Sequence, residues 1–113
     1  MHELSIVMSI VEIAQEQAHN AHASAIEEIE LDIGVLSSIE MSALEFAWRE
    51  GVKHTLLENA VKKINRIQGR AKCMDCAAEF EVNNYYDACP VCGEHLITIL
   101  QGKEMRVKSL VIT

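Results

Sequence analysis

Hydrophobic residues near the start of the chain recur with the period of an α-helix. Three isoleucines, Ile6, Ile10 and Ile13, widen the apolar stripe, so we expect this helix to be covered on more than one side. The pattern predicts a helix from Leu4 to His19, with Asn20 as a left-handed stop. The stripe itself consists of Leu4, Val7, Met8, Val11, Ala14 and Ala18.

The next segment alternates strictly between apolar and acidic residues over positions 29–33. Such alternation predicts a half-buried strand, with Ile29, Leu31 and Ile33 inside and a solvated acidic face on the other side. Gly34 ends the strand. The acidic face is expected to comprise Glu28, Glu30 and Asp32.

A second helix is predicted after this strand. Ser37 with Glu40 three residues later has the pattern of a capping box, in which each side chain bonds the backbone N–H of the other residue. Gly51 falls inside the helical pattern and should weaken the last turn. The residues expected to be buried are Met41, Leu44, Ala47, Trp48 and Val52.

The segment from Leu56 to Gln68 is ambiguous. Its apolar residues fit a helix, and Ile64 fits an edge strand, although less well. Beyond it, strands are predicted over 78–82 and 96–100, with a turn at 83–84. A last strand alternates Met105, Val107 and Ser109 with Arg106, Lys108 and Leu110. The predicted organisation is a helix–strand–helix body, a module inserted from about Arg70 to Gln101, and a strand that returns to the body.

Composition narrows the function classes. The chain has 113 residues and a net charge of −7, whereas a general nucleic-acid binder needs a basic surface. No apolar run approaches the ~18 residues of a membrane span, and the start lacks the basic region of a signal peptide. We therefore expect a cytoplasmic protein with no nucleic-acid or membrane partner. In a reducing compartment, paired cysteines are more often metal ligands than disulfides.

The four cysteines of the chain form two C-x-x-C pairs separated by twelve residues, Cys73 with Cys76 and Cys89 with Cys92. Four thiolates close a tetrahedron around Zn²⁺ and leave no open position, so the site is expected to be structural rather than catalytic. A redox dithiol would need only one pair. Gly93 allows the positive φ of the second turn, while Ala77 must make the first turn less comfortably.

His95 follows the last cysteine by three residues and has two interpretations. It is either a polar surface residue or an alternative ligand that exchanges with a cysteine. The tyrosines at 85–86 could stack on bases, but the charge of the module is acidic, which disfavours a nucleic-acid ribbon.

The first residues, Met1-His2-Glu3, are the second feature with specific chemistry. The amine of Met1, the deprotonated amide nitrogen of His2 and its Nδ1 atom can form two fused chelate rings, which suit square-planar Ni(II) or Cu(II). The fourth ligand is either the Glu3 amide or an outside group. The alternative is a frayed end with no role. The other three histidines, at 19, 22 and 54, are interpreted as exposed or cap residues.

Taken in order, these motifs resemble the HypA/HybF family of hydrogenase maturation factors, which are nickel metallochaperones. The resemblance runs from the start of the chain to its last strand and departs from the family pattern at Ala77, at 67–70 and in the last three residues. It is carried by residues 1–6, 31–36, 44–47, 57–60 and 102–109 together with the two cysteine pairs.

The resemblance implies an α+β fold: two helices packed on a three-stranded sheet, with an inserted zinc-ribbon-like β module holding the four cysteines. The expected division is a nickel-binding domain of residues 1–69 and 102–113 and a zinc-binding domain of residues 70–101. The ambiguous segment becomes a strand over Ile64 to Ala71, and the preceding helix ends near Lys53 or His54. His2 is then the required nickel ligand, and Glu3 is expected to act in partner docking or at the nickel site.

The resemblance also implies a function and partners. Such proteins deliver Ni(II) as cargo to the large subunit of [NiFe]-hydrogenase with a HypB-type GTPase, in some organisms also to urease through its accessory proteins. The chain is therefore expected to be no enzyme, with structural Zn²⁺. It is either a monomer or a homodimer. The alternative function is a zinc-ribbon interaction or regulatory module, for which His2 would be incidental.

Overall fold

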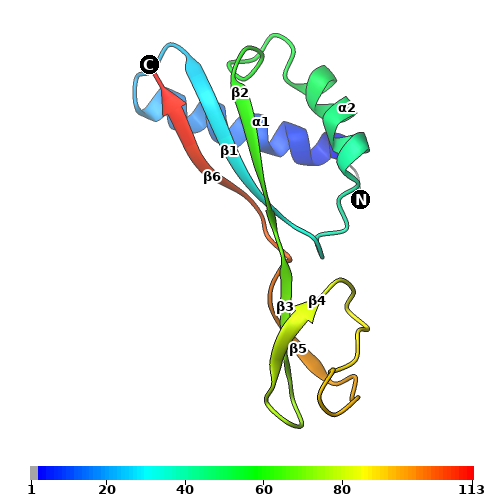
Figure 1. Ribbon diagram of the computed structural model, residues 1–113. Helices are drawn as coiled ribbons and strands as arrows, with labels where there is room; N and C mark the ends of the chain where they lie inside the picture. Colours follow the sequence, from blue (N-terminus) through cyan, green and yellow to red (C-terminus); the bar gives the residue numbers. More distant parts are fainter. Residues whose placement is uncertain (1–2) are drawn as a thin grey trace. The chain divides into compact units, whose positions relative to one another are not determined.

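The computed structural model describes residues 3–113, which form two helices and six strands (Figure 1). The strands form two three-stranded sheets with the orders β2-β1-β6 and β4-β3-β5, so the expected α+β class is confirmed. Among the described residues no helix is long and apolar enough to cross a membrane. In chain order the elements are α1 (Glu3–Asn20), β1 (Ile26–Gly34), α2 (Met41–Gly51), β2 (Val61–Ile67), β3 (Gly69–Cys73), β4 (Glu79–Val82), β5 (Ile97–Gln101) and β6 (Met105–Ile112).

The chain separates into two compact units. The first contains the chain up to Leu31 together with Ile39–Asn65 and Arg106–Thr113, and the second contains Asp32–Ser38 and Arg66–Met105. The second unit is therefore larger than the expected module of residues 70–101, because the end of β1 and the loop after it belong to it. Leu36 of that loop is 4% exposed and lies in the apolar cluster of this unit.

The helices of the first unit bury only part of the faces that their sequences predict, because Leu4 and Met8 of the expected stripe are 53% and 48% exposed. Ile13, which was expected to be covered as well, is also exposed. α1 buries five residues, including Val7 and Ile10, and α2 buries Leu44, Ala47 and Trp48, whereas Met41 is only half-buried. The two helices pack closely at Gly51, where an added Cβ would lie 2.6 Å from Cγ1 of Val7. Gly51 is the last residue of α2, and its lack of a side chain allows α1 to approach closely. Its role is therefore more than the expected weakening of the last turn.

The predicted capping box is wrong. Glu40 is itself the N-cap of α2, and its carboxylate accepts hydrogen bonds from the backbone N–H groups of Ser42 at 3.2 Å and Ala43 at 2.7 Å. Ser37 instead donates its hydroxyl to the carbonyl of Gly34 at 2.6 Å. The physical reason is Ser38, whose φ of +64° is left-handed and prevents a helix from starting at Ser37.

The ambiguous segment is a strand in its second half, so its interpretation as a helix is wrong. α2 ends at Gly51, turns follow, and β2 starts at Val61, earlier than the resemblance implies. The strand expected to run on to Ala71 is broken at Gln68 into β2 and β3, which belong to different sheets. Lys62 of β2 ion-pairs with Glu45 and lies 5.2 Å from the ring centroid of Trp48.

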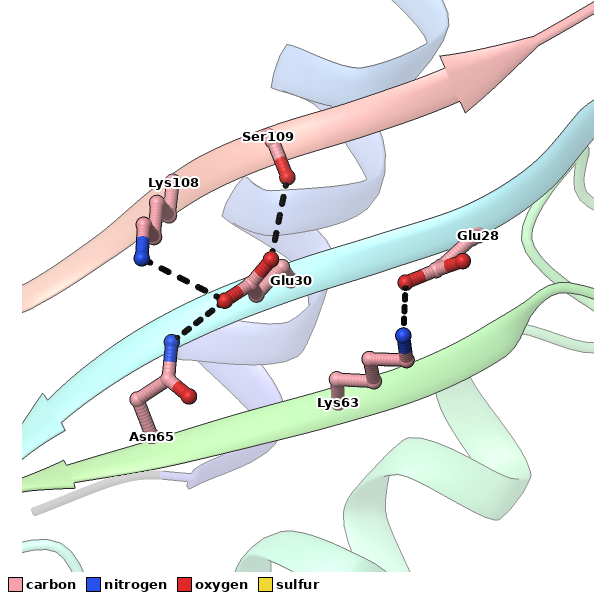
Figure 2. Close-up of polar contacts among 6 residues, drawn as sticks. All are labelled: Glu28, Glu30, Lys63, Asn65, Lys108 and Ser109. Atoms are coloured by element: carbon pink, nitrogen blue, oxygen red, sulfur yellow. Dashed lines mark hydrogen bonds and ion pairs between the residues drawn. The ribbon is translucent and has the colours of Figure 1, made fainter.

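The acidic face of β1 is not simply solvated. Asp32 is 2% exposed, which contradicts the expectation for that residue. Glu28 pairs with Lys63 of β2 at 2.8 Å, and Glu30 accepts a hydrogen bond from the side-chain amide of Asn65 at 2.7 Å (Figure 2). Basic and amide groups on the neighbouring strands thus neutralise this row of carboxylates.

The alternation predicted for β6 breaks in the middle of the strand. Lys108 and Ser109 are consecutive and both exposed, and both reach Glu30, at 3.4 Å each (Figure 2). The alternation of half-buried and exposed residues therefore shifts by one position at this point of β6. Leu110, expected on the side of Lys108, is instead half-buried.

Candidate metal centre

Two similar turns present the four cysteines. The first begins at Cys73, the last residue of β3, and closes with a hydrogen bond from Ala77 N–H to the Cys73 carbonyl at 3.0 Å. In the second, Gly93 N–H donates to the Cys89 carbonyl at 2.8 Å. Both closing residues have positive φ, +64° at Ala77 and +79° at Gly93, as the sequence predicts. The backbone therefore shapes each pair for a common ion.

The four sulfur atoms converge on one point. All lie within 4.8 Å of one another, with Cys73 Sγ 3.5 Å from Cys92 Sγ and Cys76 Sγ 3.6 Å from Cys89 Sγ. These separations are far too long for a disulfide bond. A tetrahedron with ~2.3 Å metal–sulfur bonds has edges of roughly 3.8 Å, so the cluster has the dimensions of a four-thiolate site.

The electrostatics of the cluster favour a cation. Backbone N–H groups of Cys92 and Val91 point at the Cys89 sulfur and lower the pKa of that thiol to about 7. The N–H of Glu94 acts in the same sense on Cys92, but the neighbouring sulfurs and burial outweigh it and raise the pKa of Cys92 to about 12. One thiolate thus forms readily, while all four together need a bound cation to offset their repulsion.

The metal site and the apolar cluster of the second unit are continuous. Six buried residues form this cluster, and two of them are the ligands Cys73 and Cys89. The other four are Leu36, Ala71, Phe80 and Val82. This apolar cluster is small for the second unit, so a metal ion held by the four cysteines would contribute to the folding of the unit.

His95 lies outside the cluster of ligand atoms. Its Nδ1 atom is 3.1 Å from the carbonyl oxygen of Tyr86, and its ring is exposed. Among the described residues, the group that could hold a metal ion comprises the four cysteines alone. The surface interpretation of His95 therefore fits this arrangement.

Of the first three residues, the structure describes only Glu3. Met1 and His2, the expected nickel ligands, lie outside the described residues. Glu3 is the first residue of α1, and its Oε2 atom accepts a hydrogen bond from the N–H of Glu40 at 3.4 Å. The sequence contains no signal for this contact, because the two residues lie 37 positions apart. The remaining histidines, at 19, 22 and 54, are exposed.

Comparisons with known proteins give one answer over the whole length. Residues 1–112 match the family described as hydrogenase/urease nickel incorporation metallochaperone, HypA. A hydrogenase maturation factor HypA from Parabacteroides distasonis is 50% identical over 112 residues, covering 99% of this chain and 97% of the relative. One from Geobacter metallireducens is 41% identical over 110 residues, with 97% of each chain covered.

A solved structure shares the fold. The solution structure of the nickel metallochaperone HypA from Helicobacter pylori aligns with a TM-score of 0.71 and 31% identity, covering 99% of this chain and 97% of that one. The match extends through both sheets and includes the segment that holds the four cysteines. The chain belongs to the HypA family of hydrogenase maturation factors.

Proposed function

We propose that this chain is a nickel metallochaperone that binds Ni(II) at its first residues and delivers it during the maturation of [NiFe]-hydrogenase. The observation that carries the proposal is the match to the nickel-incorporation family over residues 1–112, which includes the Met1-His2-Glu3 start. The family description also names urease, and we propose this enzyme as a second acceptor of nickel bound in the same way.

The proposed nickel site uses the amine of Met1, the amide nitrogen of His2 and its imidazole Nδ1. Three nitrogens in one plane suit square-planar Ni(II) and leave a coordination position for an acceptor protein. Cargo has to leave, so an incomplete protein ligand set is an advantage here. The Glu3 amide or a partner's group completes the plane.

The position of Glu3 supports this proposal. The carboxylate of Glu3 contacts the N-cap of α2 through Glu40 N–H, so the residue that follows His2 is held against a second element. The carboxylates of Glu3 and Glu40 bring two negative charges to this end of the first unit, which favours a divalent cation there.

The four-cysteine cluster is proposed to hold resident Zn²⁺. Four thiolates fill a tetrahedral shell, so this ion stabilises the second unit and does not exchange as cargo. The division of labour expected from the sequence, with nickel bound by residues 1–69 and 102–113 and zinc by residues 70–101, is part of the proposal. The bound zinc would supply the folding energy that the small apolar cluster lacks.

The proposed partners are a HypB-type GTPase, the hydrogenase large subunit and, for urease, its accessory proteins. The proposed compartment is the cytoplasm, where a reducing environment keeps Cys76 and Cys92, the two exposed thiols, available to zinc. The chain is proposed to act without catalysing a reaction of its own. Monomer and homodimer both remain compatible with this role.

Calorimetric titration of the zinc-loaded protein with Ni(II) tests the nickel site. We expect one site in the native chain, and its loss in both His2→Ala and a chain with an acetylated N-terminus, in which the amine of Met1 is an amide and no new amine is available. His22→Ala, an exposed histidine outside the proposed site, is the matched control and should bind as the native chain does. Unchanged nickel affinity in the first two variants would refute the site.

A further inference from the structure

A groove of about 450 Å³ lies between the C-terminal half of α1 and the edge strand β6, within the first unit. Its lining contains both apolar and polar groups, and the apolar residues include Ile13 of α1 and Val107, Leu110 and Ile112 of β6. Ile13 is 47% exposed, which is unusual for an isoleucine next to a core. The proposed metal sites use none of these residues.

β6 is an edge of its sheet. The strand order β2-β1-β6 leaves β6 with a neighbour strand on one side only, in the part of the chain that the structure describes. One row of its backbone N–H and C=O groups is therefore not used by the sheet. The groove begins at this row, so backbone hydrogen-bonding groups and apolar side chains are offered together.

The helix α1 is longer than the three-stranded sheet is wide. α1 has 18 residues and is about 27 Å long. Three strands spaced at ~4.8 Å cover only about 14 Å. α1 runs behind the strands in Figure 1, and its N-terminal half packs on α2 at Gly51. Its C-terminal half extends over β6, where one more strand would cover Ile13.

The charges of the sheet indicate the chemistry of that strand. β1 contributes Glu28 and Glu30, and each pairs with a lysine of a flanking strand, Lys63 of β2 or Lys108 of β6 (Figure 2). The signs thus alternate across the sheet. Lys108 is still 54% exposed, so a further acidic neighbour on its free side would continue the alternation.

A second copy of this chain is a poor occupant. An antiparallel β6–β6 pair centred on Val107 would bring Arg106 of each copy opposite Lys108 of the other, and like charges directly opposite each other are destabilising. The fitting occupant is therefore a different chain.

We propose that β6 and its groove dock an extended acidic segment of a partner protein, which adds as a fourth strand and places alternate apolar side chains under α1. Backbone hydrogen bonds to β6 provide the affinity, the groove selects apolar residues at every second position, and Lys108 selects carboxylates. This docking does not depend on the proposed nickel or zinc chemistry.

Amide hydrogen exchange of the zinc-loaded protein, followed by NMR with a synthetic peptide as probe, tests the proposal. The probe is an eight-residue capped peptide of alternating Val and Glu, which matches the eight residues of β6. We expect exchange in β6 to slow at least about tenfold at saturation, with no effect on β2. A Val/Lys peptide and a Val/Glu peptide with a central proline should both fail to protect β6.

Two variants of α1, at residues of similar exposure, distinguish binding in the groove from nonspecific binding to apolar surface. Ile13→Lys should weaken binding of the Val/Glu peptide about tenfold, because the lysine occupies the groove. Met8→Lys replaces a residue that is 48% exposed on the same helix but outside the groove, and it should bind as the native chain does. Neither change touches a buried residue, so folding should persist.

Several results would overturn the proposal. These are no protection of β6, equal protection by the acidic and basic peptides, or equal binding by the Ile13→Lys and native chains. Protection of β6 that rises with protein concentration in the absence of peptide, together with a doubled mass, would instead assign the groove to a second copy. Nickel titration of Ile13→Lys should be unchanged, which keeps this test separate from that of the proposed function.

Discussion

Exchanging the residues that close the two cysteine turns should change stability in opposite directions. Gly93 and Ala77 occupy equivalent positions with φ of +79° and +64°, and each closes its turn by a hydrogen bond to the first cysteine carbonyl. A Cβ added at Gly93 would meet no atom within 4 Å. The methyl group of Ala77 is exposed. Neither change therefore alters packing, and the left-handed backbone alone determines the outcome.

The magnitude follows from two opposing terms. A side chain in the left-handed region costs roughly 1–2 kcal/mol, and alanine in place of glycine returns about 0.4–1 kcal/mol by restricting the unfolded chain. Gly93→Ala should therefore lower the free energy of unfolding by about 0.5–1 kcal/mol, and Ala77→Gly should raise it by a similar amount. The double variant, Ala77→Gly with Gly93→Ala, should unfold like the native chain because the two changes cancel.

Urea unfolding of the zinc-loaded protein provides the assay. Both tyrosines, Tyr85 and Tyr86, lie in the second unit, so near-ultraviolet circular dichroism reports its unfolding. The single tryptophan, Trp48, lies in the first unit, and its fluorescence serves as the internal control. The reasoning is refuted if Ala77→Gly destabilises the second unit, or if Gly93→Ala leaves its midpoint unchanged.

Three further perturbations follow from the same structure. Gly51→Ala should destabilise the first unit by about 1–3 kcal/mol in urea, because its Cβ would lie 2.6 Å from Cγ1 of Val7; a second change, Val7→Ala, should restore part of the loss, and additive effects would contradict the contact. Hydrogen bonding by Asn65 lowers the pKa of Glu30 from its ordinary 4.5, so the folded state binds fewer protons there and stability falls as pH drops below about 4.5; Glu30→Gln should flatten this dependence in thermal melts between pH 3 and 6, and an unchanged slope would oppose it. Removal of metal by a chelator should abolish the tyrosine signal while Trp48 fluorescence and helical circular dichroism persist, whereas loss of all three signals together would show that the units fold as one.

The sequence predicts the helices and the metal cluster well because their signals are local. The stripe from Leu4 to Ala18 has the period of a helix, and α1 spans Glu3–Asn20. The spacing of the cysteines determines their ligand geometry, and their four sulfur atoms converge as expected. At both turns the positive φ was predictable, even at Ala77, since the closing residue of such a turn has little conformational choice.

The features that the sequence does not predict depend on residues distant along the chain. Lys62 of β2 contacts Trp48 and Glu45 of α2, and no local period in the sequence shows these contacts. The burial of Asp32 and the pairing of Glu30 with Lys108 require the neighbouring strands to be known. The sequence shows the two residues of each pair, but it does not show the strand register that brings them together.

The candidate sites differ in the same way. The four cysteines form two pairs with the same spacing, so their pattern in the sequence identifies them as candidate metal ligands. The nickel proposal rests on His2, a single residue whose meaning comes from its place next to a free amine and from the family. The contact between Glu3 and Glu40 joins positions 37 residues apart and was visible only in the structure.

The boundary between the two compact units is crossed four times by the chain, after Leu31, Ser38, Asn65 and Met105. No single cut can therefore separate them into expressible fragments. Deleting residues 66–105 would leave behind Leu36, a member of the apolar cluster, with its partners gone. The second unit is thus not one continuous segment, and its residues cannot be transferred intact to another protein as a single piece of chain.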